Sequence, residues 1–386
     1  MRWLVLAALV ALSAAAPAHV VFVVDGAPEW QSLMSALPKA DVYMRMTPAG
    51  GSQPESAEAA SAMSTGCVGS RRAVAVRGVP LGVRAARAGA ATGAVTNVCL
   101  TDPTVAAFFV AAPDRYNTAM LAASMRAAGL AVSMGGSSRL IMPLNATGDV
   151  CFPNTRAALV ASLGACPAQR PLMGAFGDAR TAMAAECLPL PFANDNRTRT
   201  MLLPSLDDMT RAALSRLKAT HPGRSVFLVV GSDRLDQAAH AGYVDACKAE
   251  VAATAAAVNS TLSALSARLR AGDALVIVTA DHGTIMNTNH HTNRTVPVLI
   301  YGAGAVAAAE RAMGSPLTNA HMMRPPVIAA VDFPRLFPFF PSDDRRCSRE
   351  PSDDTMSTAI IATTSVVLFI IASVLFWKLL VRRKVE

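Results

Sequence analysis

Short apolar runs that alternate with longer amphipathic stretches are the feature that most limits how this chain can fold. The runs predicted to be strands are Val20–Val24, Gly93–Val98, Ser225–Val230, Ala274–Thr279 and Thr295–Tyr301. The stretches predicted to be helices are Ser56–Thr65, Asn117–Ala128, Leu206–Thr220 and Tyr243–Ala271. Strands and helices in alternation are typical of α/β domains. We therefore expect a doubly wound, mainly parallel central sheet with helices on both faces.

Two terminal segments are predicted to lie outside this domain. Residues 1–18 have a charged start, an apolar stretch and small residues up to Ala16 and Ala18, which is the pattern of a cleaved signal peptide. Thr358–Trp377 is an uncharged apolar run of 20 residues, long enough to cross a bilayer as a transmembrane helix. The basic tail, residues 378–386, is expected to be cytoplasmic, as in a single-pass type I membrane protein. A GPI anchor signal fits less well, because basic residues follow the apolar run.

The residues between these segments are expected at the cell surface or in a secretory-pathway lumen. Residues 19–340 form the predicted folded domain, and residues 130–205, rich in Pro, Cys and Gly, are predicted to be an insertion or cap. Residues 341–357 read as a polar juxtamembrane stalk. The seven cysteines all lie on this side, so disulfides are allowed, and an odd count leaves at least one thiol unpaired or pairing between chains. Glycosylation sequons occur at Asn145, Asn196, Asn259 and Asn293.

The composition supports a large core and gives little sign of a polyanionic partner. Apolar residues make up 52% of the chain, and the formal net charge is +8. The basic residues are scattered, with few aromatic residues between them. A nucleic-acid surface needs clustered basic residues, so we expect no nucleic-acid partner.

Acidic and histidine side chains follow three of the predicted strands. The residues at these strand ends are Asp25, then Asp236 and His240, then Asp281, His282, His290 and His291. Taken singly, each motif is more often a turn or a surface ion pair than a site. The carboxyl ends of parallel strands, however, meet at one edge of a sheet, where α/β proteins build their sites. Zinc binds this mixture of imidazole and carboxylate ligands, so the sequence predicts a metal centre there.

Ser56 offers an alcohol at the start of a predicted helix. One interpretation is a plain N-cap serine, which is common at helix starts. The other is a nucleophile placed where the helix dipole and free N–H groups favour an anion.

In this order, these residues resemble the motifs of the alkaline phosphatase family. The matching segments are "VVDG" with Asp25, "PESAEAASAMSTGC" with Ser56, "VTNVCLTDPTVAAF" with Asp102 and Thr104, "PDRY" with Arg115, "FLVVGSDRLDQAAH" with Asp236 and His240, "VTADHG" with Asp281 and His282, and "HHTNRTVPVLIYG" with His291, or His290 in the alternative register. The resemblance covers most of residues 20–303 and is weak in residues 130–205.

The resemblance implies two zinc ions and one magnesium ion. The first zinc would be bound by Asp236, His240 and His291. The second would be surrounded by Asp25, Ser56, Asp281 and His282, and magnesium by Asp25, Asp102 and Thr104. In such an enzyme Ser56 attacks phosphorus to give a phosphoserine, and Arg115 grips two phosphate oxygens with its planar guanidinium.

Three positions depart from the family pattern. Gly231 stands where the family has a glutamate ligand of magnesium, so we expect loose magnesium binding. Asp233, two residues further on, is a possible substitute, since strand side chains repeat every second residue. Glycine at 231 either marks a lost carboxylate, which Gly231→Glu would restore, or a close backbone approach. Glu55 replaces the usual aspartate before the serine, and residues 282–291 form a shorter connection than in the family.

Three functions therefore compete. The first is a membrane-anchored hydrolase of small phosphate monoesters, for which the resemblance also implies a possible homodimer. The second is a related hydrolase of phosphodiesters, phosphonates or sulfate esters. The third is a surface ectodomain with weak or no turnover, for which Gly231 is the best support.

Overall fold

The computed structural model describes residues 16–340 except Glu29 and residues 139–148, 177–186, 189–202, 319–320 and 322–323, together with Cys347. The chain divides into two units, Met1–Cys347 and Ser348–Glu386, and every described residue belongs to the first. The predicted span Thr358–Trp377 and residues 1–15 of the predicted leader lie outside the described part. Within that part, no helix combines the length and apolar character needed to cross a membrane.

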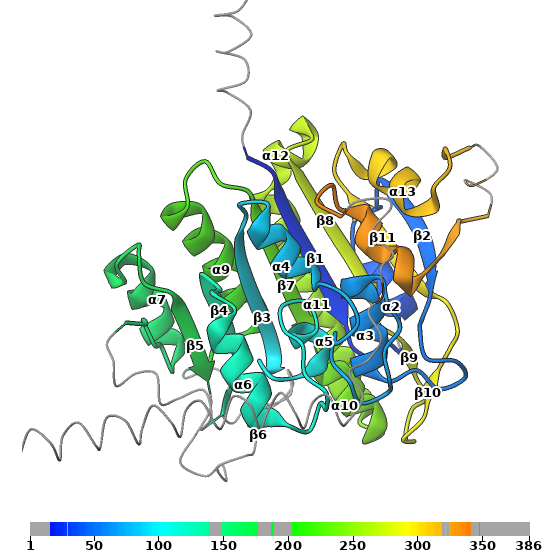
Figure 1. Cartoon of the computed structure of the whole chain (residues 1–386), viewed down its shortest axis with the longest axis horizontal. Helices are drawn as coiled ribbons and strands as arrows, with labels where there is room; N and C mark the ends of the chain where they lie inside the picture. The colour runs from blue at the N-terminus through cyan, green and yellow to red at the C-terminus, as the bar shows by residue number, and fades with distance from the viewer. Residues whose placement is uncertain are drawn as a thin grey trace, which may run out of the picture. The chain divides into compact units, whose positions relative to one another are not determined.

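The described strands form one large sheet and one short hairpin (Figure 1). They are β1 (Ala18–Val24), β2 (Val42–Thr47), β3 (Ala91–Cys99), β4 (Val132–Ser138), β5 (Leu172–Phe176), β6 (Cys187–Leu188), β7 (Val226–Ser232), β8 (Ala274–Ala280), β9 (Gly283–Thr284), β10 (His291–Thr292), β11 (Val296–Tyr301) and β12 (Val327–Ala329). The main sheet runs in the order β12-β2-β11-β8-β1-β7-β3-β4-β5, and β6 pairs with β4.

Helices connect these strands and pack on the sheet. They are α2 (Trp30–Ala36), α3 (Ser56–Thr65), α4 (Leu81–Arg87), α5 (Pro103–Ala106), α6 (Thr118–Ala127), α7 (Arg156–Ala165), α9 (Leu206–Thr220), α10 (Arg234–His240), α11 (Val244–Ala264), α12 (Ser266–Ala271), α13 (Ala305–Met313) and the 3-10 helix η2 (Ala330–Leu336). The order of elements is that of an α/β domain, as the sequence predicts.

The centre of the sheet is parallel and buried. Strand β1 pairs in parallel with both β7 and β8, and β7 pairs in parallel with β3. Every residue of β1, β3, β7 and β8 is buried, so both faces of the sheet are covered there. Among the described strands, antiparallel pairing is found between β11 and both β8 and β2, between β4 and β6, and in the separate β9–β10 hairpin. The predicted mainly parallel sheet is confirmed.

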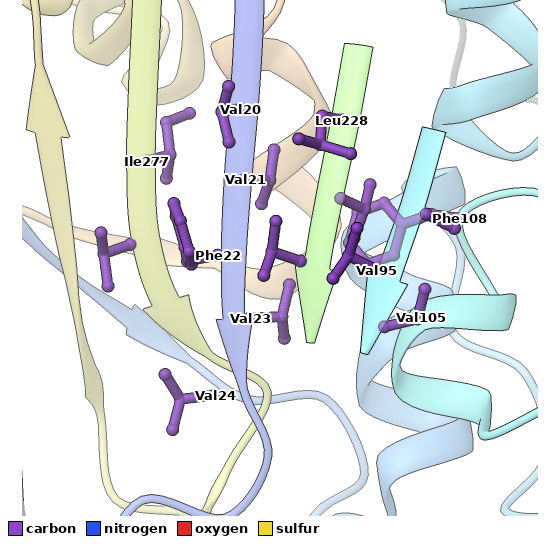
Figure 2. Close-up of a cluster of buried hydrophobic side chains, with 14 of the residues drawn as sticks. Val20, Val21, Phe22, Val23, Val24, Val95, Val105, Phe108, Leu228 and Ile277 are labelled. Carbon is purple, nitrogen blue, oxygen red and sulfur yellow. The ribbon is translucent and has the colours of Figure 1, made fainter. Parts of the chain in front are cut away.

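Valine is the commonest residue of β1, β7 and β8 because these strands are buried on both sides. Figure 2 shows Val21 and Phe22 of β1, Val95 of β3 and Leu228 of β7 gathered with Val105 of α5 in one cluster. Their burial makes the four central strands a rigid platform for the loops that follow them.

The helix predicted over Tyr243–Ala271 is wrong as a single element. It is divided at Leu265, which ends α11 and precedes α12 with φ −103° and ψ 5°. The apolar periodicity continues across this residue, so the sequence shows no break. Strand β2 was not predicted, although its residues alternate between buried and exposed. In the region predicted as an insertion or cap, β4 and β5 extend the central sheet.

Disulfides join one distant and one nearby pair of cysteines in the domain. Cys67 is bonded to Cys347, 280 residues away, and Cys151 is bonded to Cys166. Cys99 is also disulfide-bonded, whereas Cys247 is a buried thiol. The expectation of disulfides with one thiol left over is confirmed for these residues.

His19 in β1 makes the stability of the domain depend on pH. Its buried ring meets the edges of Phe337 and Phe339, with ring centroids 5.9 and 5.5 Å away. Burial, reinforced by the positive charges of Arg311 and Arg268, lowers the pKa of His19 from 6.5 to about 4.

We predict that His19→Leu removes part of this pH dependence. As the pH falls, the unfolded chain binds a proton near pH 6.5 but the folded chain only near pH 4, so stability is lost in this window. Between about pH 7.5 and about pH 5, His19 should cost the wild type about 2 kcal/mol of unfolding free energy. Urea unfolding at both pH values measures this, and an unchanged pH dependence in His19→Leu would contradict it.

Candidate metal centre and active site

The carboxyl ends of four adjacent strands carry most of the residues singled out in the sequence. Strands β8, β1, β7 and β3 are neighbours and run parallel, so their carboxyl ends meet at one edge of the sheet. Asp25 follows β1, Asp281 follows β8, and Asp102 follows β3. Helix α10, with Asp236 and His240, follows β7. In Figure 1 the arrowheads of these strands point towards α3, α5 and α10.

Asp236, His240 and His291 form the first candidate metal group. The Nε2 atom of His240 lies 3.1 Å from Asp236 Oδ2 and 3.0 Å from His291 Nε2. His291 Nε2 lies 3.8 Å from Asp236 Oδ1. The hairpin of β9 and β10 carries His291 back to α10, so the short connection after His282 is enough to bring these residues together.

The hydrogen bonds behind these rings prepare them to bind a cation. His291 Nδ1 donates to the carbonyl oxygen of Pro54 at 2.6 Å, and His240 Nδ1 donates to that of Thr288. Carbonyl oxygens only accept, so in the neutral rings both Nε2 atoms carry lone pairs. Two lone pairs that face each other repel unless a cation or proton lies between them. This group therefore fits a metal ion.

Asp25, Asp281 and His282 form the second candidate group. His282 Nε2 lies 3.4 Å from Asp25 Oδ1 and 3.5 Å from Asp281 Oδ2. Burial, and then the charge of Asp236, raises the pKa of Asp281 to about 7, whereas burial lowers the pKa of His282 to about 3. The rings of His282 and His291 stack with centroids 3.9 Å apart, so the two groups adjoin.

Ser56 lies at the second group. Its Oγ is 3.2 Å from His282 Nε2 and 3.3 and 3.4 Å from the two oxygens of Asp25. Ser56 is the first residue of α3, and Glu55 rather than Ser56 is the N-cap, so the interpretation as a capping serine is wrong. The side chain of Glu55 does not cap the helix, which leaves the first turn suited to an anion.

Arg115 is brought to the same place by the loop before α6. Its guanidinium lies 3.3 Å from Glu55 Oε2, and its positive charge acts on Asp102. Arg71, which sequence analysis missed, holds the other oxygen of Glu55 at 2.7 Å. Glu55 thus lies between two guanidinium groups beside Ser56.

Asp102 and Thr104 join the site through Asp25. Thr104 Oγ1 donates to Asp25 Oδ2 at 3.1 Å, and the backbone N–H of Thr104 donates to Asp102 Oδ1 at 3.1 Å. Asp102 caps α5, so this short helix fixes both residues. Asp233 lies in the same acidic neighbourhood, because the charge of Asp102 raises its pKa.

Without bound cations, the charged carboxylates of this site reduce the free energy of unfolding. Burial, followed by mutual repulsion, raises the pKa of Asp25 and Asp233 well above the usual value. One oxygen of Asp233 and one of Asp281 are buried without a hydrogen-bond partner among the described residues. Divalent cations would satisfy these atoms and remove the repulsion, so the donor set fits metal ions.

Several supporting residues had no signal strong enough to be found in the sequence. Thr284 donates to Asp236 Oδ1, and this hydrogen bond, with that from His240, outweighs burial and lowers the pKa of Asp236. Thr96 donates to Asp233 at 2.6 Å. The one weak signal in the sequence was the presence of polar residues, such as Thr96 and Asn97, inside the apolar strand β3, which indicates that they have buried polar partners.

Comparison with known proteins agrees with this fold. A model of the alkaline phosphatase family matches residues 149–321. The structure of Thermus thermophilus alkaline phosphatase has a TM-score of 0.69 at 18% identity, over 84% of this chain and 91% of that one. The alkaline phosphatase of the Antarctic bacterium TAB5 has a TM-score of 0.64 at 19% identity, over 83% and 97%. A variant of the TAB5 enzyme has been solved with magnesium in its M3 site. No curated protein matches by sequence.

Fold and site together define an α/β domain with two candidate metal-binding groups. The structural matches show the shared fold, and the family model covers Asp236, His240, Asp281, His282 and His291. The chain therefore has the fold of the alkaline phosphatases, and residues 149–321 match the model of that family.

We predict that zinc stabilises the protein through the first group, and that His291 rather than His290 is the ligand. His290 Nδ1 meets Gln53 at 3.2 Å and is not part of either group. Zinc at 100 times its dissociation constant should stabilise the chelator-treated wild type by about 2.7 kcal/mol. Thermal denaturation with and without zinc should show this gain reduced in His291→Gln and retained in His290→Gln. The opposite pattern would assign the ligand to His290.

Proposed function

We propose that this protein hydrolyses phosphate monoesters, with Ser56 as the nucleophile at a two-zinc site. The observation that carries the proposal is the position of Ser56 Oγ, within 3.2–3.4 Å of His282 and Asp25, at the start of α3. An alcohol buried among metal-binding groups has little structural purpose there, since it does not cap its helix.

Zinc bound at the two groups would supply positive charge that lowers the pKa of an alcohol or water and stabilises charge on phosphate oxygens. Asp25 accepts a hydrogen bond from Ser56 and is placed to hold its proton as Oγ attacks phosphorus. Formation of the Oγ–P bond displaces the leaving alcohol and gives phosphoserine. Water then breaks that bond, releases phosphate and restores Ser56.

Arg115 is the residue proposed to bind the phosphate. Its fork of N–H groups can hold two phosphate oxygens, and Glu55 orients it from behind. Because Arg71 also binds Glu55, that carboxylate is neutralised and does not repel the substrate anion. The uncapped first turn of α3 adds backbone N–H groups on the same side.

We predict that Ser56→Ala lowers kcat for p-nitrophenyl phosphate by at least about 1000-fold. The carboxylate and imidazole ligands remain, so zinc content and melting temperature should stay close to the wild-type values. Ser52→Ala, an exposed serine in the preceding loop, is the matched control and should keep full activity. Near-normal turnover in Ser56→Ala would exclude a phosphoserine mechanism.

The same assay separates the competing functions. Bis-p-nitrophenyl phosphate and p-nitrophenyl sulfate test the diesterase and sulfatase alternatives, and faster turnover of either would replace the monoesterase proposal. A zinc-loaded protein that turns over none of these esters would support the inactive ectodomain.

We also propose that the domain is secreted through a cleaved leader and anchored by Thr358–Trp377. The disulfides support an oxidising compartment. Asn259 and Asn293, the sequons within the described part, are exposed and accessible to glycosylation.

We predict that truncation before Ser357 gives a secreted, glycosylated and active protein, because the apolar run is removed while Cys347 is kept. Immunoblotting of medium and membrane fractions, with and without glycosidase, measures this. If the truncated chain stays in membranes after an alkaline carbonate wash, the anchor lies elsewhere. The full-length chain, found in the membrane fraction, is the control.

A further inference from the structure

Gly231, the residue that departs most from the family pattern, lies where no side chain fits. It is paired with Val23 of β1 on one side and Thr96 of β3 on the other. A Cβ atom at Gly231 would lie 2.4 Å from Cγ2 of Val105, the α5 residue shown at the end of β3 in Figure 2. A close approach is therefore present at this glycine, but side chains rather than backbone make it, and Gly231→Glu would clash rather than restore a ligand.

The carboxylate of Asp233 fills the space in front of Gly231. Its two oxygens lie 2.7 and 2.9 Å from the position that a Cβ at Gly231 would take. Asp233 follows the last residue of β7, and its side chain turns back over the strand rather than capping α10. The carboxylate of Asp233, two residues later in the chain, therefore lies where a side chain at position 231 would begin.

Asp233 is buried, and half of its carboxylate has no partner. The residue is 1% exposed, and Oδ1 makes no hydrogen bond with the described residues. Burial and the negative charge of Asp102 raise the pKa of Asp233. The hydrogen bond from Thr96 lowers this pKa, but the net shift is upward. A buried acid next to another acid needs a proton or a cation.

The strand beside it holds Asp233 in place. Thr96 Oγ1 donates to Asp233 Oδ2 at 2.6 Å, which leaves Oδ1 for another partner. Asn97 Oδ1 accepts from the backbone N–H groups of Asp233 and Arg234 at 2.8 and 3.1 Å, and Asn97 Nδ2 donates to Glu250 at 3.1 Å. Both the backbone and the side chain of Asp233 are therefore fixed from β3.

We propose that Asp233 supplies the third cation site with the carboxylate that Gly231 lacks, next to Asp102 and Thr104, and that Thr96 is its positioning residue. This rests on the proposed function, and it replaces the expectation of loose magnesium binding. The donors are carboxylate and hydroxyl oxygens without imidazole or sulfur, a set that favours Mg²⁺ or Mn²⁺ over zinc.

The test is Mn²⁺ binding to the zinc-loaded, full-length protein, followed by the loss of the free Mn²⁺ signal in electron paramagnetic resonance. The wild type should bind one Mn²⁺ per chain, and Mg²⁺ should displace it. Asp233→Asn keeps the size of the side chain and should weaken Mn²⁺ binding by at least about 100-fold. Zinc content should not change.

The second set of variants tests the positioning role without removing a ligand. Thr96→Val should weaken Mn²⁺ binding by about 10-fold, and Thr96→Ser, which keeps the hydroxyl, should restore it. Asp207→Asn is the matched control, because Asp207 also has a buried, unpartnered oxygen but lies on α9, outside the site. Its Mn²⁺ affinity should equal that of the wild type.

The outcomes separate this inference from the proposed function. Wild-type Mn²⁺ affinity in Asp233→Asn, or no third ion in an active two-zinc wild type, overturns the role of Asp233 and leaves phosphatase activity standing. If zinc displaces Mn²⁺ and Mg²⁺ does not, the assignment of this site to Mg²⁺ or Mn²⁺ is overturned. A wild type that binds no zinc and hydrolyses no ester overturns the proposed function itself. If Asp233→Asn does not fold, the Thr96→Val and Thr96→Ser pair decides.

Discussion

Repulsion among buried carboxylates is the constraint on which the rest of the site depends. Asp25, Asp233 and Asp281 are buried at one edge of the sheet and Asp102 is half-buried there, and each has a raised pKa. Arg115 and the histidines cannot neutralise them all, because His282 is held neutral at ordinary pH. The rigid parallel strands prevent the acids from moving apart. Folding energy is therefore used to hold like charges together. Bound cations would offset this cost, which would couple the stability of this edge to metal binding.

Much of this arrangement could be predicted from the sequence. Strands that are buried on both faces appear as continuous apolar runs, and this is why β1, β7 and β8 were found close to their true bounds. Polar residues directly after such runs must meet at one edge when the strands are parallel. That rule placed Asp25 and Asp281 together although they are 256 positions apart.

What the sequence could not show depends on contacts made in three dimensions. The sequence named Asp233 as a possible substitute ligand, but the lack of room for a side chain at Gly231 follows from the nearness of Val105, which lies on another element. The pairing of Glu55 with Arg71 as well as Arg115 depends on how a loop folds over α3. The break at Leu265 leaves the helical periodicity intact, so no local signal marks it. Strand β2 is a different case, because its alternating residues are a strand signal that the sequence did carry and that was overlooked.

The disulfide between Cys67 and Cys347 sets the order in which this protein can be completed. The two cysteines are separated by 280 residues, so at about 5–20 residues per second roughly 15–55 s of synthesis pass between them. During that interval Cys67, which lies just after the helix that carries Ser56, has no Cys347 to pair with. Cys99, Cys151 and Cys166 are synthesised in the same interval and can form competing disulfides with it. Correct pairing thus depends on the early strands shielding Cys67, or on a disulfide isomerase correcting the result, and the rate of translation becomes a determinant of yield.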